Sequence, residues 1–183
     1  MVNISIKFLR KKMDSGSFCS KQNLILVGFM GSGKTTVGRL LAQERGLFLL
    51  DTDMLIESKV GYQIAQIFAR FGEPYFRNLE KELFQWLKTS VRGAVVATGG
   101  GLPIHCENIN QAGKVFYLQM EFEQILQRLS QDECDKRPLF QDIERTRILF
   151  QARIPIYEAC ADAMIDASLD SADIVQQILE IVD

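Results

Sequence analysis

Short apolar runs alternate along the chain with longer segments in which apolar residues recur at helical spacing. The run LILVG at 24–28 ends in a glycine-rich loop, and LFLLD at 47–51 ends on an acid. Runs of this length are typical of buried strands, and recurrence every three or four positions is typical of amphipathic helices. Strands are predicted at 24–28, 47–51, 93–101, 114–119 and 163–167, and helices from Lys34 to Gly46 and at about 53–70, 74–90, 103–112, 121–131, 142–160 and 171–182.

Strands that alternate with helices predict an α/β fold with a parallel sheet. Right-handed crossover connections place helices on both faces of that sheet. A single domain is expected over 23–183. The basic segment 1–22 is predicted to be an N-terminal extension; a flexible tail or a later start at Met13 is favoured over a targeting arm. The highly charged segment 131–147 predicts an exposed excursion that can act as a mobile lid.

Composition and charge narrow the function classes. Hydrophobic residues make up 47 % and charged residues 24 % of the 183 residues, which are ordinary globular values. The net charge of −2 lacks the positive field expected of a nucleic-acid-binding protein. No apolar run approaches the length of a membrane span. We therefore expect small-molecule substrates and no nucleic-acid or membrane partners. A monomer is expected as well, although these values do not bear on the oligomeric state.

Cysteine and histidine usage argues against a metal centre built on those residues. Cys19, Cys106, Cys134 and Cys160 lie at long, irregular spacings without a C-x-x-C pair, and His105 is the only histidine. The cysteine pattern favours free thiols in a reducing compartment, which is consistent with a cytoplasmic protein. A single histidine argues against histidine-based triads and multi-histidine metal sites.

The glycine-rich loop carries the most specific short motif. Residues 28–36, GFMGSGKTT, match G-x-x-x-x-G-K-[ST] and stand between a predicted strand and a predicted helix. Backbone N–H groups of such a loop and the positive end of the helix can hold the phosphates of a nucleotide. Lys34 would reach the β- and γ-phosphates, and the Thr35 hydroxyl would hold Mg²⁺. The predicted ATP-binding residues of this loop are Gly31, Ser32, Gly33, Lys34, Thr35 and Thr36.

Two acids follow the second predicted strand. Ligands of open α/β sheets bind outside the carboxyl ends of the strands, so Asp51 and Asp53 are expected beside the phosphate loop. Asp51 would face the Mg²⁺ region, with water as a bridge. Asp53 would accept a hydrogen bond from a substrate hydroxyl and serve as its base. The alternative is that Asp53 only caps the following helix.

The third predicted strand runs into the triple glycine 99–101, which is more glycine than a turn requires and suggests backbone close to a ligand. Arg77, Arg137 and Arg153 offer planar, bidentate partners for a carboxylate and for phosphates. Each arginine alone would be interpreted as a solvated surface charge. Arg137, in the charged segment, could close over the phosphates during the reaction.

Taken together, these segments resemble the shikimate kinase family. Its members are small P-loop kinases of the nucleoside-monophosphate-kinase-like group. The resemblance extends from about residue 24 to the end of the chain, and several segments in the right order are far more specific than the loop alone. The residues that carry it are GFMGSGKTTVGRLLA (28–42), DTD (51–53), IAQIFARFGEPYFRNLE (64–80), VVATGGG (95–101), RPL (137–139) and RIPIYEACAD (153–162).

The resemblance implies a three-layer P-loop kinase fold with a five-stranded parallel sheet of order 2-3-1-4-5. It also implies a substrate-binding helical segment at about 54–85 and a lid at about 131–147. The implied reaction is transfer of the γ-phosphoryl group of ATP to the 3-hydroxyl of shikimate, with Mg²⁺. The implied roles are catalysis by Lys34, Asp53 and Arg137, ATP contacts by Arg128 (on adenine) and Arg137, and substrate binding by Asp53, Arg77, Gly99, Gly100, Gly101 and Arg153.

Two alternatives to this function remain. A gluconate-kinase-like enzyme would share the phosphate loop but would not be expected to carry GEPYFRNLE and the triple glycine. A non-catalytic nucleotide-binding module would be expected to have lost residues such as Asp53 or Arg153, which are present. The link between Arg137 and Arg153 is shorter than the family pattern suggests, which bears on the geometry of the lid.

Overall fold

The computed structural model describes residues 22–129, 140 and 142–183. The predicted extension 1–22, apart from its last residue, lies outside these residues, as do most of the predicted lid and Arg137. Within the part of the chain that is described, no helix is long and apolar enough to cross a membrane.

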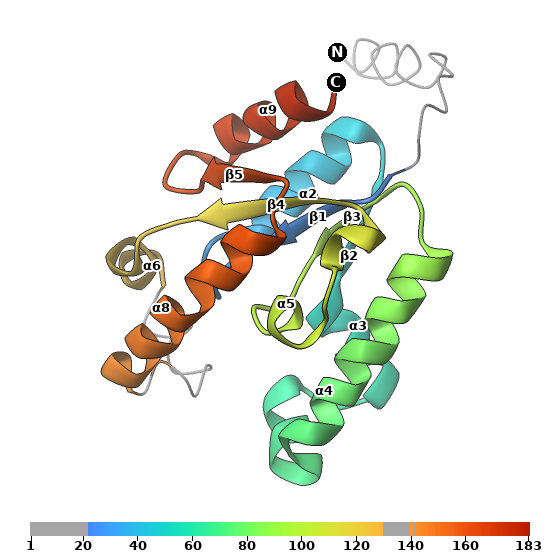
Figure 1. Cartoon of the computed structure of the whole chain (residues 1–183), viewed down its shortest axis with the longest axis vertical. Coiled ribbons are helices and arrows are strands. Elements are labelled where there is room, and N and C mark those ends of the chain that lie inside the picture. Colours follow the sequence, from blue (N-terminus) through green and yellow to red (C-terminus); the bar gives the residue numbers. More distant parts are fainter. Residues whose placement is uncertain (1–21, 130–139, 141) are drawn as a thin grey trace, which may run out of the picture.

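Five parallel strands form one sheet in the order β2-β3-β1-β4-β5, which confirms the predicted topology (Figure 1). The central strand β1 pairs with β3 on one side and β4 on the other. All four residues of β1 and all four of β3 are buried, as expected for parallel strands covered on both faces. The strands are β1 Leu24–Val27, β2 Phe48–Asp51, β3 Ala94–Ala97, β4 Lys114–Gln119 and β5 Ala163–Asp166.

Helices cover both faces of the sheet. On one face α2 lies against α9, and on the other α8 and α5 lie side by side, with α4 next to α5 (Figure 1). The helices are α2 Lys34–Arg45, α3 Thr52–Val60, α4 Ile64–Ser90, α5 Leu102–His105, α6 Phe122–Arg128, α8 Ile143–Cys160 and α9 Ser171–Val182, with a 3-10 helix η1 at Ile109–Ala112.

The helix predicted at 53–70 was wrong in extent, because the chain forms two helices there. Gly61 ends α3 with a left-handed φ of 78°, and its N–H donates to the Glu57 carbonyl. The helix predicted from residue 74 belongs to α4, which begins at Ile64 and is interrupted at Gly72, where φ is 78° and ψ is 169°. Both glycines adopt a backbone conformation that side chains rarely permit, and each stops a helix.

The break at Gly72 sets the direction of the longer part of α4. Pro74 lies in the first turn after the break, where its missing N–H has no intrahelical partner to lose. A second, smaller core joins α3 to α4 and is separate from the main core around the sheet. This small core supports the predicted substrate-binding segment; its buried members are Ile56, Ile67, Phe76 and Leu79.

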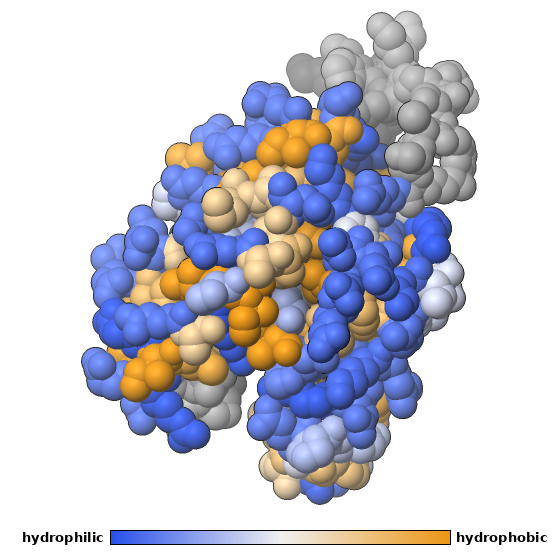
Figure 2. Space-filling view, in the orientation of Figure 1, coloured by the Kyte–Doolittle hydropathy of each residue, from blue (hydrophilic) through white to orange (hydrophobic). Residues whose placement is uncertain are grey.

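The predicted lid overlaps a regular helix. Residues 143–147 form the start of α8, where the Asp142 side chain accepts a hydrogen bond from the Arg145 N–H. The last five residues of the predicted lid are therefore helical. A cleft opens on the surface between the part of the molecule that contains α4 and the part that contains α8 (Figure 2).

Candidate active site

The phosphate loop joins β1 to α2 and wraps around its own lysine. Lys34 is the first residue of α2, is buried, and its Nζ donates to the carbonyls of Gly28 at 2.9 Å and Phe29 at 2.7 Å. Gly31 and Gly33 have φ values of 84° and 90°, which let the loop curl in this way. Among the described residues, no side chain caps the N-terminus of α2. Its N–H groups and the Lys34 charge therefore converge on one place, as an anion site requires.

Thr35 and Asp51 form a polar pair beside this loop. Thr35 Oγ1 donates to Asp51 Oδ2 at 2.8 Å. The other carboxylate oxygen, Asp51 Oδ1, accepts the N–H groups of Asp53 at 3.1 Å and Met54 at 3.3 Å. Asp51 is thus the N-cap of α3, so the alternative that assigned this cap to Asp53 was wrong. β2 ends at residue 51, which places the extended backbone of an N-cap there.

Asp53 lies in the first turn of α3, pointing toward the end of β3. Burial, and after it the neighbouring Asp51 carboxylate, raise its pKa from 3.8 to about 6 against the opposing effect of the Lys34 charge. A carboxylate with a pKa near neutrality can accept a proton from a substrate hydroxyl more readily than an ordinary aspartate. The same cap geometry that fixes Asp51 therefore fixes a candidate base two residues later.

The triple glycine makes room for three predicted site residues. A Cβ at Gly99 would overlap Asp53 Oδ1, and one at Gly101 would lie 2.7 Å from Arg77 Nη1. Gly100 is less crowded, with Arg153 Nη1 at 3.6 Å from such a Cβ. All three glycines have ordinary φ values, so their missing side chains matter for space and not for backbone freedom.

Arg77 is held by two glutamates of its own helix. Its Nε and Nη2 donate to Glu73 Oε1 at 3.0 and 2.7 Å, and its Nη1 donates to Glu80 Oε2 at 2.7 Å. Glu73 is exposed, whereas Glu80 is buried, and burial raises the pKa of Glu80 against the opposing effect of Arg77. Sequence reasoning missed both glutamates, although their i−4 and i+3 spacing from Arg77 is a detectable signal.

Arg153 reaches the same glycines from α8. It is buried, and its Nη1 donates to the Gly100 carbonyl at 3.3 Å. Tyr157, one turn later on α8, donates its hydroxyl to the same carbonyl at 2.6 Å. Arg153 Nε is buried and has no hydrogen-bond partner within the described part of the chain. Arg77 and Arg153 therefore reach the triple glycine from two different helices, as a clamp for one anion requires.

Arg128 lies beside the phosphate loop, on the side that faces the end of β5. Its Nη2 donates to the carbonyls of Ser168 at 3.1 Å and Leu169 at 3.3 Å, just beyond β5. Its Nη1 lies 3.9 Å from the position of a Cβ on Gly33. The structure thus brings Arg128 to the edge of the phosphate loop, while Arg137 lies outside the described residues. Ser32 is buried in the loop, and Thr36 follows Thr35 in the first turn of α2.

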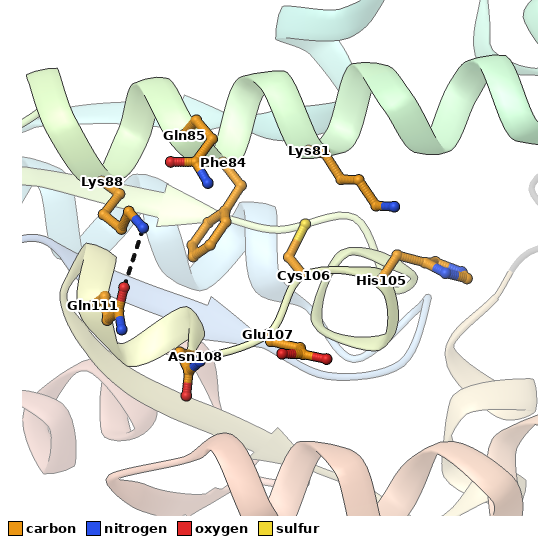
Figure 3. A pocket seen from close by; sticks show the side chains of 9 residues that line it. All are labelled: Lys81, Phe84, Gln85, Lys88, His105, Cys106, Glu107, Asn108 and Gln111. Carbon is orange, nitrogen blue, oxygen red and sulfur yellow. Dashed lines mark hydrogen bonds between the residues drawn. The ribbon is translucent and has the colours of Figure 1, made fainter.

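A separate groove lies between α4 and the segment from His105 to Gln111 (Figure 3). Its volume is about 430 Å³, and none of the predicted site residues lines it. Lys88 Nζ donates to Gln111 Oε1 at 3.2 Å, which joins its two walls at one end. Burial raises the pKa of the Cys106 thiol at its wall to about 11, so this thiol is protonated. The candidate active site is thus distinct from this groove.

The fold and these side chains define a small P-loop kinase: a phosphate loop with its lysine, a hydroxyl–carboxylate pair suited to a divalent cation, a candidate base, and two arginines at the triple glycine. The chain belongs to the shikimate kinase family, because a family model described as shikimate kinase matches residues 30–183. A shikimate kinase from Helicobacter hepaticus is 46 % identical over 162 residues, which cover 88 % of this chain and 96 % of that protein. The resemblance predicted from the sequence is confirmed.

Solved structures agree with this family. The shikimate kinase from Acinetobacter baumannii in complex with shikimate has a TM-score of 0.78 at 38 % identity, and the match covers 88 % of this chain and 92 % of that one. A gluconokinase from Sinorhizobium meliloti has a TM-score of 0.57 at 15 % identity, covering 87 % of this chain and 90 % of that one. At that identity the second likeness shows a shared fold and gives no support to the alternative substrate.

Proposed function

We propose that this protein transfers the γ-phosphoryl group of ATP to the 3-hydroxyl of shikimate, giving shikimate 3-phosphate and ADP. The observation that carries the proposal is the two-ended arrangement of side chains around the triple glycine. Asp53 lies at Gly99, between the lysine-bearing loop and the two arginines at Gly100 and Gly101. A substrate that fits such a place presents a hydroxyl toward the ATP end and a carboxylate toward the arginines.

At the ATP end, the phosphate loop binds the nucleotide. Lys34 would exchange some of its hydrogen bonds to the loop carbonyls for contacts with the β- and γ-phosphates. The N–H groups and side chains of Gly31, Ser32, Gly33 and Thr36 complete the phosphate contacts, with Arg128 at adenine and Arg137 at the transferred group; these assignments follow the family pattern.

The Thr35–Asp51 pair fits Mg²⁺. Both groups offer oxygen, the donor that this hard cation prefers. Within the described residues there is no group of three or more histidine, cysteine or acidic side chains arranged for a metal. Thr35 would hold the ion directly and Asp51 would hold it through water. Bound there, Mg²⁺ supplies charge neutralisation for the phosphates.

At the acceptor end, Asp53 positions the hydroxyl and takes its proton. The transition state of phosphoryl transfer is loose, so positioning and charge neutralisation supply most of the catalysis. Arg77 and Arg153 bind the carboxylate by planar, bidentate hydrogen bonds. Gly99, Gly100 and Gly101 let the substrate and these side chains approach the same backbone. The helices α3 and α4 then correspond to the substrate-binding segment.

An ADP-release assay with matched acceptors tests the proposal. Purified protein with ATP and Mg²⁺ should release ADP in proportion to added shikimate, and the product should carry one phosphate on the 3-hydroxyl. Gluconate and nucleoside monophosphates serve as control acceptors and should leave the rate at its background. Faster release with gluconate, or a rate that no acceptor changes, would contradict the proposed substrate.

A further inference from the structure

The carbonyl of Gly100 is shared by two donors from α8. The Tyr157 hydroxyl donates to it at 2.6 Å, and Arg153 Nη1 donates to it at 3.3 Å. Tyr157 is completely buried, and its ring lies against that of Tyr117 with 5.3 Å between centroids. The tyrosine is therefore held by packing as well as by its hydrogen bond. The short bond from the hydroxyl is the main interaction of this carbonyl, and the long contact from the arginine is secondary.

Arg153 retains donors that its surroundings do not use. Its Nε is buried without a hydrogen-bond partner among the described residues, and the contact of Nη1 with Gly100 is long. A buried donor without an acceptor is costly, so a guanidinium in this state gains strongly from a planar carboxylate. If the tyrosine hydroxyl were absent, the Gly100 carbonyl would need another donor. The nearest one is the guanidinium of Arg153 itself.

We propose that Tyr157 is a positioning residue: by satisfying the Gly100 carbonyl, its hydroxyl keeps Arg153 directed at the carboxylate of the substrate. The inference depends on the proposed function, because it assigns the carboxylate to Arg153. Burial raises the pKa of Tyr157 to about 12, while the Arg153 charge and a hydrogen bond with the Arg153 side chain oppose this shift. The hydroxyl therefore remains a donor over the whole working pH range. Without it, Arg153 would turn toward Gly100 and lose part of its bidentate geometry.

The test compares Tyr157→Phe with Tyr117→Phe. Both tyrosines are buried and their rings are in contact, but the structure gives a hydrogen bond to Gly100 only for Tyr157. We expect Tyr157→Phe to raise KM for shikimate by about five- to tenfold, the usual effect of one lost hydrogen bond, with KM for ATP and kcat changed less than about twofold. Tyr117→Phe should leave all three constants within about twofold of wild type.

A shikimate analogue without its carboxylate separates positioning from a general loss of structure. With this analogue, kcat/KM of Tyr157→Phe should equal that of the wild-type protein, because Arg153 then has no anion to bind. An unchanged KM for shikimate, or the same loss with the analogue as with shikimate, would overturn the role of Tyr157. Failure of the wild-type protein to phosphorylate shikimate would instead overturn the proposed function, and this inference with it.

Discussion

Replacement of Asp53 by asparagine should make the protein more stable and less active at once. Burial and the neighbouring Asp51 carboxylate raise the pKa of Asp53 to about 6. The charged form of Asp53 is therefore disfavoured in the folded protein. The native state binds the proton between pH 3.8 and about 6, where the unfolded chain has already released it. Relative to an uncharged side chain, Asp53 therefore costs no stability below pH 3.8. The cost grows as the pH rises from 3.8 and is complete above about 6.

The magnitude follows from these two pKa values. The difference between 3.8 and about 6, at 1.36 kcal/mol per pH unit, corresponds to about 3 kcal/mol when the group is fully ionised. Asparagine keeps the size of the side chain and removes the charge. The free energy of unfolding of Asp53→Asn should thus exceed that of the wild-type protein by about 1 kcal/mol at pH 4.5 and about 3 kcal/mol at pH 8.

Urea denaturation at a series of pH values measures this difference. The pH dependence is its own control, because a packing effect of asparagine would be the same at every pH. A variant that is less stable than wild type at pH 8, or a difference that does not grow with pH, would refute the assignment of a buried, ionised carboxylate at this position. The slope of free energy on urea should be equal in the two proteins.

The same substitution tests the proposed base. We expect kcat of Asp53→Asn to fall by at least about a hundredfold, the usual contribution of a positioned base, while the affinity for ATP remains near that of wild type. For the wild-type protein, kcat/KM for shikimate should decline on the acid side with a midpoint near the raised pKa of Asp53, about 6. Full turnover by the variant would show that Asp53 has only a structural role.

Further substitutions at Lys34, Arg153 and the triple glycine test the rest of the site. Lys34→Ala should reduce kcat by at least about a hundredfold in the ADP-release assay, because it removes a positive charge from the phosphates; near-normal turnover would contradict that role. Arg153→Lys should raise KM for shikimate by about tenfold with little change in kcat, since a point charge cannot replace a bidentate clamp; an equal KM would remove Arg153 from the pocket. Gly99→Ala should lower kcat/KM far more than Gly100→Ala, because an added Cβ overlaps Asp53 at Gly99 but meets nothing closer than 3.5 Å at Gly100; equal losses would argue against steric crowding as the cause.

Much of the fold could be predicted because each strand is a local signal. The central strands are continuous apolar runs, and the parallel sheet follows from their alternation with helices. The strand order came from the family resemblance and is confirmed. The division of the predicted helix at 53–70 was missed because Gly61 was not treated as a break, although its φ is 78°; the gap predicted between residues 70 and 74 does contain the break at Gly72. Glycine within a helical pattern is a weak signal until its backbone conformation is known.

Only part of the site could be predicted from the sequence, and the reason is physical. Asp51 and Asp53 could be located because they follow a strand directly, and the carboxyl ends of parallel strands meet at one edge. The contacts of Gly100 could not, because residues 100 and 157 are joined only when α8 packs beside α5. The triple glycine suggested close approach of a ligand, and what the structure adds is close approach of the site's own side chains.

Two unfavourable arrangements meet in this crevice, and the proposed substrate would relieve both. Asp53 is a buried carboxylate that resists ionisation, and Arg153 keeps a buried donor without a described partner. Such costs are tolerated where a well-packed framework holds the side chains in place, which the sheet and the small core provide. A hydroxyl at Asp53 and a carboxylate at Arg153 would satisfy both groups together. A ligand that lacks either group leaves one of them unsatisfied, and an unpaired polar group in the pocket is what rejects close analogues most strongly.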